Sequence, residues 1–424
     1  MKRGLLRALV FALVISSGAF AERPVIDLNG ARVQAYPLAV AKGLGDPQAA
    51  VTVQTVLSQD FEHSGLFKLL DPASFLAKDG LSNIDYPAWA NVGAQGLVKL
   101  SCTAALTCEF RLYDVGGAHE LLHGTYSAPP GGLRQVAHRF GDDVVRYFTQ
   151  EPGTFQTRIA YVRQTADGKQ IVVADSDGYG PQPLTGASIN LLPAWTPDGK
   201  TIAFTSLRDG SGAHIYSVDV LTRQLRPLVL MGDFASGPVY SPDGLKFTYS
   251  SALNDNTDVY VSQADGSAGR RLTDSRAIDV SATWSPDGRR IAFISDRAGT
   301  PQVYTMLADG TEVKRLTFQG NYNQEPAWSP KGDLLAFSGR DEKRAFDIYT
   351  VNLETGKVAR LTQNAGTNEK PAWSPNGRQL LYSSSRSGKR QLWVMSSDGT
   401  NQRQLTAENL GASDPAWGPL GATR

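Results

Sequence analysis

The residues that could carry catalysis are few and scattered. The five histidines are His63, His119, His123, His138 and His214, and only the last falls beyond the first 152 residues. A serine hydrolase needs a nucleophile elbow of the form G-x-S-x-G, and the nearest approach, GASIN at 186–190, lacks the closing glycine. A metal-dependent lyase needs several histidine or carboxylate ligands that converge on one site. The chemistry-bearing residues therefore favour neither class of enzyme.

The two cysteines predict a structural bridge. Cys102 and Cys108 bracket the loop TAALT, and the runs on either side alternate like two strands of a hairpin. In an oxidising compartment we expect a disulfide across this loop. So short a loop gains little from closure, and two cysteines with no histidine in the spacing make a poor metal-ligand set. No cofactor and no metal site is predicted.

A phrase built around one aromatic residue recurs along the last two thirds of the chain. The aromatic anchors are Trp195, Tyr240, Trp284, Trp328, Trp373 and Trp417, at intervals of 45, 44, 44, 45 and 44 residues. A period this regular is typical of a repeat architecture, in which each unit buries its apolar face against its neighbours. We expect the anchors to pack between neighbouring units rather than to bind a ligand.

Each repeat contains four short strands. An apolar run such as TIAFTS at 201–206 follows the anchor, a second run such as HIYSVD comes next, and a Leu-Thr segment ends the unit. Pro-Asp-Gly or a variant separates the first strand from the second, because proline presets one corner of a turn and glycine tolerates positive φ near its end. Four strands in about 40–45 residues are typical of a β-propeller blade.

The repeats predict a ring of six blades over residues 153–424. Residues 158–185 match the second, third and fourth strands of the repeat but have no anchor strand, whereas Trp417 has an anchor strand only. The two fragments complete one blade. The C-terminal strand is therefore expected to pair near residue 160 and to close the ring, which removes an exposed sheet edge.

The first 21 residues have the pattern of a secretory signal peptide. Lys2, Arg3 and Arg7 lead into an apolar run of about ten residues that ends in Ala-Phe-Ala. An uncleaved membrane anchor is the alternative, but the run is shorter than the ~20 residues of a span, so no direct membrane span is expected. Cleavage between Ala21 and Glu22 leaves 39 basic and 41 acidic residues. That balance gives no support for nucleic-acid binding.

Residues 22–152 are predicted to form a small α/β domain. Asp46 and Pro47 mark a helix start and Gly65 a helix end, and residues 132–148 carry apolar side chains at three- and four-residue spacings. Strands are expected at 25–30, 33–40, 66–71, 97–102 and 109–115. The segment QEPGTF then forms the linker. The fold class is mainly β, a six-bladed propeller preceded by an α/β domain.

If the propeller is a binding platform, recognition residues should surround one mouth of its channel. The anchor strand is the innermost strand of a blade, so the polar residues just before each anchor are expected to line that mouth, where they vary among otherwise constant phrases. These candidates are Asp233, Ser236, Asp279, Ser281, Asn323, Gln324, Glu325, Asn368, Glu369, Lys370, Ser413 and Asp414, with Ser188 and Asn190 at the equivalent place in another blade. Ordinary solvated loops are the alternative.

The order of a signal peptide, an α/β domain and a six-bladed propeller with repeated PAWSPNG and ADG…RLT phrases resembles the TolB family of the Tol–Pal envelope system. The resemblance covers essentially the whole mature chain. It implies a non-enzymatic periplasmic adaptor that supports outer-membrane integrity and constriction at cell division through protein–protein interactions. The same blade type occurs in peptidases and polysaccharide lyases, so a secreted propeller enzyme acting at the channel is the alternative.

The resemblance also implies two partners. The lipoprotein Pal would bind the propeller, for which the channel-mouth residues are the candidates, and reversing Glu325 and Glu369 together is expected to weaken capture without unfolding the ring. TolA would bind the mature N-terminal segment, and its candidate residues are Glu22, Arg23, Pro24, Val25, Ile26, Asp27 and Leu28. This segment could add to a partner's sheet edge or fold back on its own domain. An ordinary edge strand is the alternative.

Overall fold

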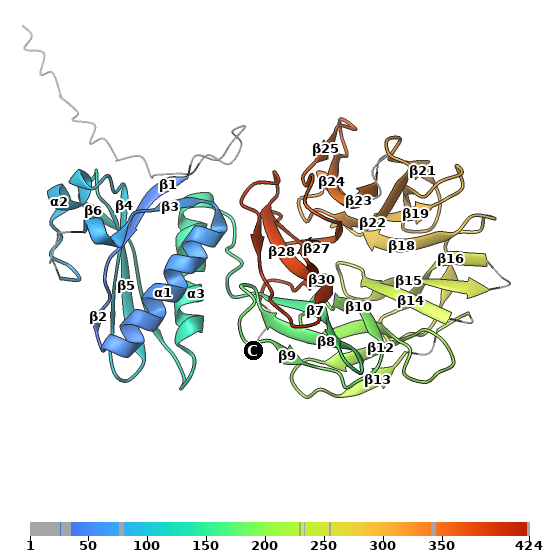
Figure 1. Cartoon of the computed structure of the whole chain (residues 1–424), viewed down its shortest axis with the longest axis horizontal. Coiled ribbons are helices and arrows are strands. Elements are labelled where there is room, and N and C mark those ends of the chain that lie inside the picture. Colours follow the sequence, from blue (N-terminus) through green and yellow to red (C-terminus); the bar gives the residue numbers. More distant parts are fainter. Residues whose placement is uncertain are drawn as a thin grey trace, which may run out of the picture.

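The computed structural model describes Ile26 and residues 35–75, 80–228, 230–232, 234–253, 256–340 and 345–421. These residues form an α/β domain, blue to teal in Figure 1, beside a propeller that runs from green to red. The predicted signal peptide and its cleavage site between Ala21 and Glu22 lie outside the described residues. Within the described ranges, no helix is both long and apolar enough to cross a membrane.

The N-terminal domain is one mixed sheet with two long helices packed on it. The strand order is β3-β1-β4-β5-β6, and β2 pairs with β4. The strands are β1 (Tyr36–Val40), β2 (Leu44–Gly45), β3 (Phe67–Leu69), β4 (Gly96–Cys102), β5 (Thr107–Asp114) and β6 (His119–Ser127). The helices are α1 (Pro47–Ser64), α2 (Tyr86–Asn91) and α3 (Leu133–Thr149), with a 3-10 turn at Pro72–Ser74. Sequence reasoning missed α2 and β6.

The two predicted long helices are confirmed, and their ends have the expected causes. The Asp46 carboxylate accepts a hydrogen bond from the backbone N of Ala49 at 2.9 Å, and Pro47 takes the first helical position of α1. Gly65 ends α1 in a left-handed conformation with φ of 69°. Helix α3 buries Phe140 and Phe148 in the core that it shares with α1 and the sheet.

The predicted cysteine pair lies on neighbouring strands. Cys102 at the end of β4 stands opposite Cys108 in β5, their Cα atoms are 4.1 Å apart, and a disulfide joins them. Both side chains are buried in the domain core. The bridge therefore fixes the β4–β5 turn and has a structural role.

The propeller has six four-stranded blades, which we number in chain order with the closing blade last. Blade 1 consists of β10 (Asn190–Trp195), β11 (Thr201–Ser206), β12 (His214–Asp219) and β13 (Leu225–Pro227). Blade 2 consists of β14 (Phe234–Tyr240), β15 (Lys246–Leu253), β16 (Asn256–Gln263) and β17 (Arg270–Arg271). Blade 3 consists of β18 (Asp279–Trp284), β19 (Arg290–Ser295), β20 (Gln302–Leu307) and β21 (Lys314–Arg315). Blade 4 consists of β22 (Tyr322–Trp328), β23 (Leu334–Arg340), β24 (Asp347–Asn352) and β25 (Val358–Arg360). Blade 5 consists of β26 (Asn368–Trp373), β27 (Gln379–Ser387), β28 (Lys389–Ser396) and β29 (Arg403–Gln404). Blade 6 consists of β30 (Ala412–Trp417), β7 (Arg158–Thr165), β8 (Gly168–Asp175) and β9 (Gln182–Pro183).

The ring closes as predicted, and the anchors hold adjacent blades together. Strand β30 pairs antiparallel with β7, with Trp417 opposite Ile159. Three anchor indoles, those of Trp195, Trp284 and Trp373, donate to the inner strand of the preceding blade. For example, Nε1 of Trp284 lies 3.2 Å from the Val239 carbonyl, and Nε1 of Trp373 lies 3.0 Å from the Ala327 carbonyl. The aromatic positions therefore serve packing between blades.

The alternation of strands gives the ring two distinct faces. Loops that enter each innermost strand lie on one side, which we call the loop face, and the Pro-Asp-Gly turns that leave it lie on the other, the turn face. The N-terminal domain contacts the turn face, where Asn376 Nδ2 donates to the Pro152 carbonyl at 3.0 Å and Lys331 Nζ lies 3.0 Å from Glu151. A partner approaching the loop face would not meet these contacts.

Candidate protein-binding site on the propeller

One residue from each blade turns into the central channel. The innermost strand of every blade carries a β-bulge, where its register with the next strand shifts. At this bulge the backbone is left-handed, with φ between 50° and 65°. The six bulge residues are Leu192, Gly237, Ser281, Glu325, Lys370 and Asp414. Left-handed backbone costs a non-glycine residue about 1 kcal/mol or more, and such strain gathers at functional sites.

The channel cavity that these residues line has a volume of 170 Å³. Proline or alanine follows each bulge residue and completes the wall, for example Pro193, Pro326 and Pro371. Pockets that enclose small molecules usually measure about 300–1,000 Å³. The cavity therefore suits one or two inserted side chains better than a substrate.

Charge occupies one half of the channel wall. Lys370 in blade 5 reaches Asp414 in blade 6 and lies 3.8 Å from Oε1 of Glu325 in blade 4. The other oxygen of Glu325 accepts from Ser338 Oγ at 2.8 Å and from the backbone N of Lys370 at 2.9 Å. The opposite half, from blades 1 to 3, presents an apolar residue, a glycine and a serine. The channel is thus electrically asymmetric.

The pKa shifts of this triad agree with its geometry. Burial raises the pKa of the Glu325 carboxyl above its ordinary value, although Lys370 acts in the opposite direction. Burial alone would lower the pKa of the Lys370 ammonium, but the Asp414 and Glu325 carboxylates outweigh it and raise that pKa. Lys370 is therefore charged at neutral pH and bridges two blades. A reversal of Glu325 would act on the stability of the ring as well as on recognition.

The expectation that every candidate residue lines the channel mouth is wrong for four of them. The four lie two positions before the bulge and are at most 2% exposed; they are Asn190, Asp279, Asn323 and Asn368. Asn368 Nδ2 donates to Asp347 Oδ1 at 3.0 Å, and its Oδ1 accepts from Arg386 at 3.0 Å. Asp347 belongs to β24 of blade 4 and Arg386 to β27 of blade 5, so Asn368 ties two neighbouring blades together. In a regular strand, side chains two residues apart lie on the same side. The β-bulge breaks this alternation, so the sequence pattern did not predict the burial of these side chains.

The remaining candidates have mixed surroundings. Ser236, Gln324, Glu369 and Ser413 precede the bulge and are half-buried. Gln324 Nε2 lies 3.3 Å from Glu369 Oε1, and the other Glu369 oxygen lies 2.6 Å from Arg390. Asp233 lies outside the described residues. The structure therefore brings Ser281, Glu325, Lys370 and Asp414 together in the channel and leaves the others around it.

Sequence reasoning missed a set of exposed apolar residues on the loop face. In five blades the loop that enters the innermost strand presents one such side chain, 45 to 72% exposed. These residues, which we call the apolar ring, are Ile189, Met231, Ile278, Phe318 and Leu410. Large apolar residues that recur around one opening mark a protein-binding surface more often than single scattered ones. The signal available in the sequence was a large apolar residue that recurs just before the innermost strand in five of the blades.

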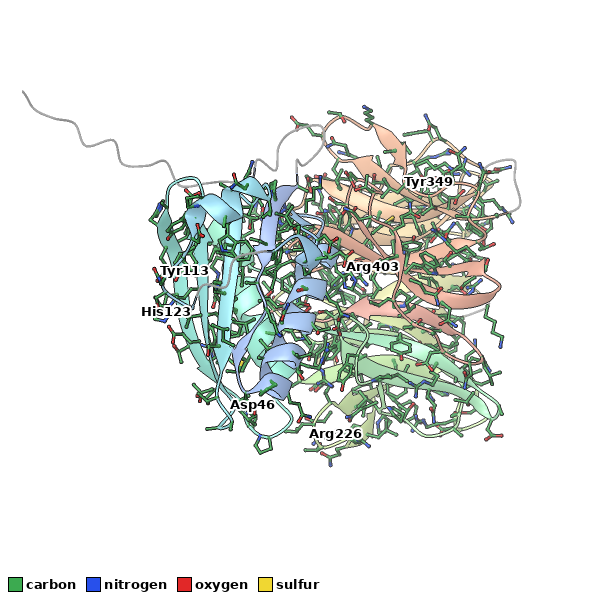
Figure 2. All side chains as sticks on the ribbon, turned by 60° about the vertical axis from the view of Figure 1, so that its left-hand side comes forward. Asp46, Tyr113, His123, Arg226, Tyr349 and Arg403 are labelled. Atoms are coloured by element: carbon green, nitrogen blue, oxygen red, sulfur yellow. A yellow bond between two sulfur atoms is a disulfide. The ribbon has the colours of Figure 1, made fainter. Side chains whose placement is uncertain are left out.

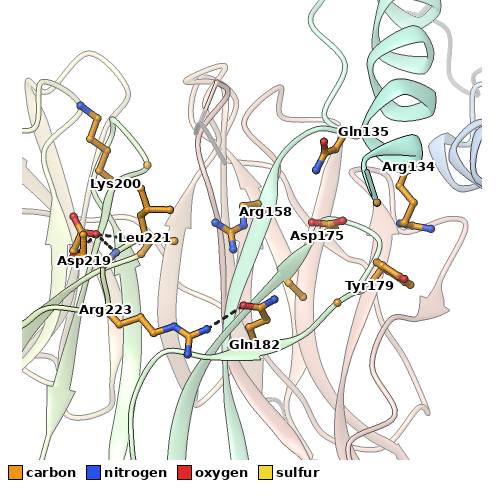
Figure 3. Close-up of a pocket in the computed structure, with 16 residues that line it drawn as sticks. Arg134, Gln135, Arg158, Asp175, Tyr179, Gln182, Lys200, Asp219, Leu221 and Arg223 are labelled. Carbon is orange, nitrogen blue, oxygen red and sulfur yellow. Dashed lines mark hydrogen bonds between the residues drawn. The ribbon is translucent and has the colours of Figure 1, made fainter. Parts of the chain in front are cut away.

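A second cleft lies elsewhere, on the turn face beside the N-terminal domain. Figure 3 shows this 530 Å³ cleft between the start of α3 and blades 6 and 1. Arg223 donates to Gln182 at 3.1 Å, and the Asp219 carboxylate accepts from the backbone N of Thr222 at 2.7 Å. Lys200 and Arg223 are exposed. The cleft is a polar surface recess whose named groups serve turns and neighbouring strands.

The N-terminal segment contributes one described residue. Ile26 is 4% exposed, packs into the core of the N-terminal domain, and donates its backbone N to the Phe148 carbonyl of α3 at 3.3 Å. The other six TolA candidates, Glu22, Arg23, Pro24, Val25, Asp27 and Leu28, lie outside the described residues. The segment is therefore docked on its own domain at Ile26.

Comparison with known proteins agrees with both domains. A TolB beta propeller domain matches residues 145–421, and a TolB amino-terminal domain matches residues 24–121. The chain is 46% identical to a Tol-Pal system protein TolB of Anaeromyxobacter dehalogenans over 99% of both chains, and 44% identical to one of Myxococcus xanthus over 49% of this chain and 50% of that one. The crystal structure of TolB from Acinetobacter baumannii superposes with a TM-score of 0.83 at 29% identity, over 93% of this chain and 99% of that one. With its bulged six-bladed ring and its α/β domain, this chain belongs to the TolB family of Tol–Pal system proteins.

Proposed function

We propose that this chain is a periplasmic, non-enzymatic adaptor of the Tol–Pal system. In this proposal the loop face of the propeller binds the lipoprotein Pal, and the mature N-terminal segment binds TolA. By engaging both partners the adaptor would support outer-membrane integrity and constriction at cell division. Membership of the TolB family supports the system, and the two surfaces described above support the assignment of a partner to each.

The observation that carries the Pal assignment is the combination of the apolar ring with the charged channel. Stable protein interfaces have an apolar centre, and a few well-packed residues supply most of their free energy. Phe318 is 72% exposed in the loop that leads into β22, and Glu325 of that strand and Lys370 line the channel. A partner could pack on the ring and insert a polar side chain between the charged residues. Complementary charge would then set its orientation.

Replacing Phe318 by aspartate tests the Pal surface. We expect Pal to bind this variant about tenfold or more weakly, because a buried carboxylate replaces an aromatic contact. The matched control is Leu245→Asp, since Leu245 is 64% exposed in a Pro-Asp-Gly turn on the opposite face. The measurement is titration calorimetry with soluble Pal, after the melting transition of each variant has been checked. Equal weakening by both variants, or none by either, would remove Pal from the loop face.

The observation that carries the TolA assignment is the docking of Ile26, the one described residue of the N-terminal segment. At its one described residue the segment is held by a single apolar side chain and one backbone hydrogen bond of 3.3 Å. Burying one isoleucine side chain contributes about 1.5–3 kcal/mol, which a partner can match. A partner that offers comparable burial could therefore draw Ile26 away from its own domain. TolA would then select the undocked state.

Deleting Glu22 to Asp27 tests the TolA segment. We expect TolA to bind the deletion variant at least about tenfold more weakly, while Pal binding is retained. The domain should also lose about 2 kcal/mol of unfolding free energy because Ile26 leaves its core. The matched control is Ile26→Ala, which causes a similar loss of stability but keeps the rest of the segment and most of the TolA binding. If TolA binds the deletion variant as well as the wild type, the segment is only a part of the fold.

A further inference from the structure

A buried network of charged side chains joins the two domains where they meet. His138 of α3 places its Nδ1 2.7 Å from Oδ2 of Asp60 in α1. Arg134, one turn earlier on α3, hydrogen-bonds Asp177 in the β8–β9 loop of the propeller, and its Nη2 lies 3.4 Å from Nε2 of His138. His138 is 0% exposed and Asp60 2% exposed. Two domains therefore share one closed charge network.

Further charged and titratable groups surround this network. They are Arg403 at the start of β29, Glu62 and His63 at the end of α1, and Asp142 on α3. Figure 2 shows Arg403 at the boundary between the two domains. Burial lowers the pKa of Arg403 to about 10, and burial together with Arg403 lowers the pKa of His63 to about 4. Arg403 is thus charged and His63 neutral at pH 7.

The arrangement of the side chains in this network favours the binding of a proton over the binding of a metal ion. Asp60, His138 and Asp177 each offer one ligand atom, and these atoms lie within 4.8 Å of one another. A zinc ion would need all three lone pairs directed at one point. The guanidinium of Arg134 instead bonds Asp177 and lies beside His138, so it supplies the positive charge that an ion would bring.

The Asp60–His138 pair titrates as one unit. Burial would lower the pKa of the His138 imidazole, but the hydrogen bond and charge of Asp60, aided by Asp177, raise it above the ordinary value of 6.5. When the pair holds the proton that Asp60 and His138 share, its net charge is zero. Without that proton it is an anion in a buried site facing the Asp177 carboxylate of the propeller. Both burial and Asp177 therefore favour the protonated pair when the domains are docked.

The sign of the pH dependence follows from these shifts. The part of this rise that depends on docking comes from Asp177, because Asp60 belongs to the same domain as His138 and stays beside it after undocking. A group whose pKa is raised by docking stabilises the docked state below its undocked pKa and loses that contribution as the pH rises. Burial raises the pKa of Asp60 to about 6, which acts in the same direction between pH 3.8 and about 6. The lowered pKa of His63 acts in the opposite direction between about 4 and 6.5. Above pH 6.5 the opposing effect of His63 is absent, and the contribution of His138 remains.

We propose that the Asp60–His138–Asp177–Arg134 network is a proton-dependent latch, which holds the N-terminal domain on the turn face and loosens as the pH rises above the neutral range. The latch does not depend on the identity of either partner protein. A neighbouring ion pair at the seam joins Glu151 to the 41% exposed Lys331, and exposed pairs of this kind contribute little to docking. The network is then the pH-sensitive part of the joint.

The test follows the distance between the domains during a pH titration. Dyes on cysteines introduced at the exposed positions Thr55 and Glu354 report docking by single-molecule energy transfer. Between about pH 6 and about pH 8, we expect the docking equilibrium of the full mature chain to fall by up to about tenfold per pH unit, the limit for one proton. The nuclear magnetic resonance titration of the His138 ring should give the same midpoint.

Three variants decide between a latch and an ordinary buried cluster. His138→Gln should abolish the pH dependence, and Asp177→Asn, a change confined to a propeller loop, should reduce it without disturbing the N-terminal core. His123→Gln is the matched control, because His123 is 47% exposed on β6, far from the seam in Figure 2, and it should keep the wild-type profile. A pH-independent distance in the wild type, tighter docking at higher pH, or an unchanged profile in Asp177→Asn would overturn the proposal.

Discussion

Replacing Lys370 by methionine is expected to lower the unfolding free energy of the propeller by about 3 kcal/mol at pH 7. The ammonium of Lys370 bridges Glu325 and Asp414 across three blades, and the methionine would leave both carboxylates without a cation. The value lies at the lower end of the range for broken buried pairs, because the Lys370 side chain is 25% exposed. Chemical denaturation of the mature chain measures the change.

The pH dependence separates this cause from a packing defect. Burial already raises the pKa of Glu325, and loss of the lysine raises it further. A carboxyl group with a raised pKa contributes stability at low pH and loses it as the pH rises, so the deficit of the variant should shrink toward about pH 4.5. The matched control is Lys331→Met, which breaks an exposed pair with Glu151 and should cost at most about 1 kcal/mol. Equal costs for both variants would mean that the channel triad adds no stability.

Replacing Asn368 by alanine is expected to cost about 2 kcal/mol of unfolding free energy. The amide joins Asp347 of blade 4 to Arg386 of blade 5, and its removal leaves buried polar groups with fewer partners. Gln324→Ala is the matched control, because its half-buried amide makes one 3.3 Å hydrogen bond to Glu369 and should cost about 0.5 kcal/mol or less. Thermal unfolding of both variants gives the comparison. A stable Asn368→Ala variant that loses Pal binding would return this residue to the binding surface.

The sequence predicted the ring well because its signals are local and repeated six times. An anchor, a turn and two apolar runs in each unit require no knowledge of distant contacts. Side-chain direction at the channel was harder to predict, since a strand's alternation fails at a bulge. Asn368 and Lys370 are two residues apart, so regular alternation would place both on one side, yet one is buried in the blade and the other lines the channel.

The joint between the domains could not be predicted from the sequence at all. His138 and Asp60 are 78 residues apart, and Arg134 and Asp177 come from different domains. In the sequence His138 is one polar residue of a predicted amphipathic helix, and other residues already make up the apolar face of that helix. Only the packing of α1, α3 and the β8–β9 loop turns it into a buried charge. The missed strand β6 has a similar cause, because HELLHGTYS carries no regular alternation of buried residues.

The closure of blade 6 by β30 also sets a condition on how the chain folds. The Trp417 indole bonds Thr157 across a sequence separation of 260 residues, and no shorter contact can substitute for it in completing the ring. Contacts this distant in sequence are slow to form, because the entropy of closing the loop is lost before the contact stabilises anything. Until β30 arrives, β7 presents an unpaired edge that another chain could occupy. The ring is therefore vulnerable to misassembly for as long as its first and last inner strands remain apart, and chaperones that shield strand edges would act in that interval.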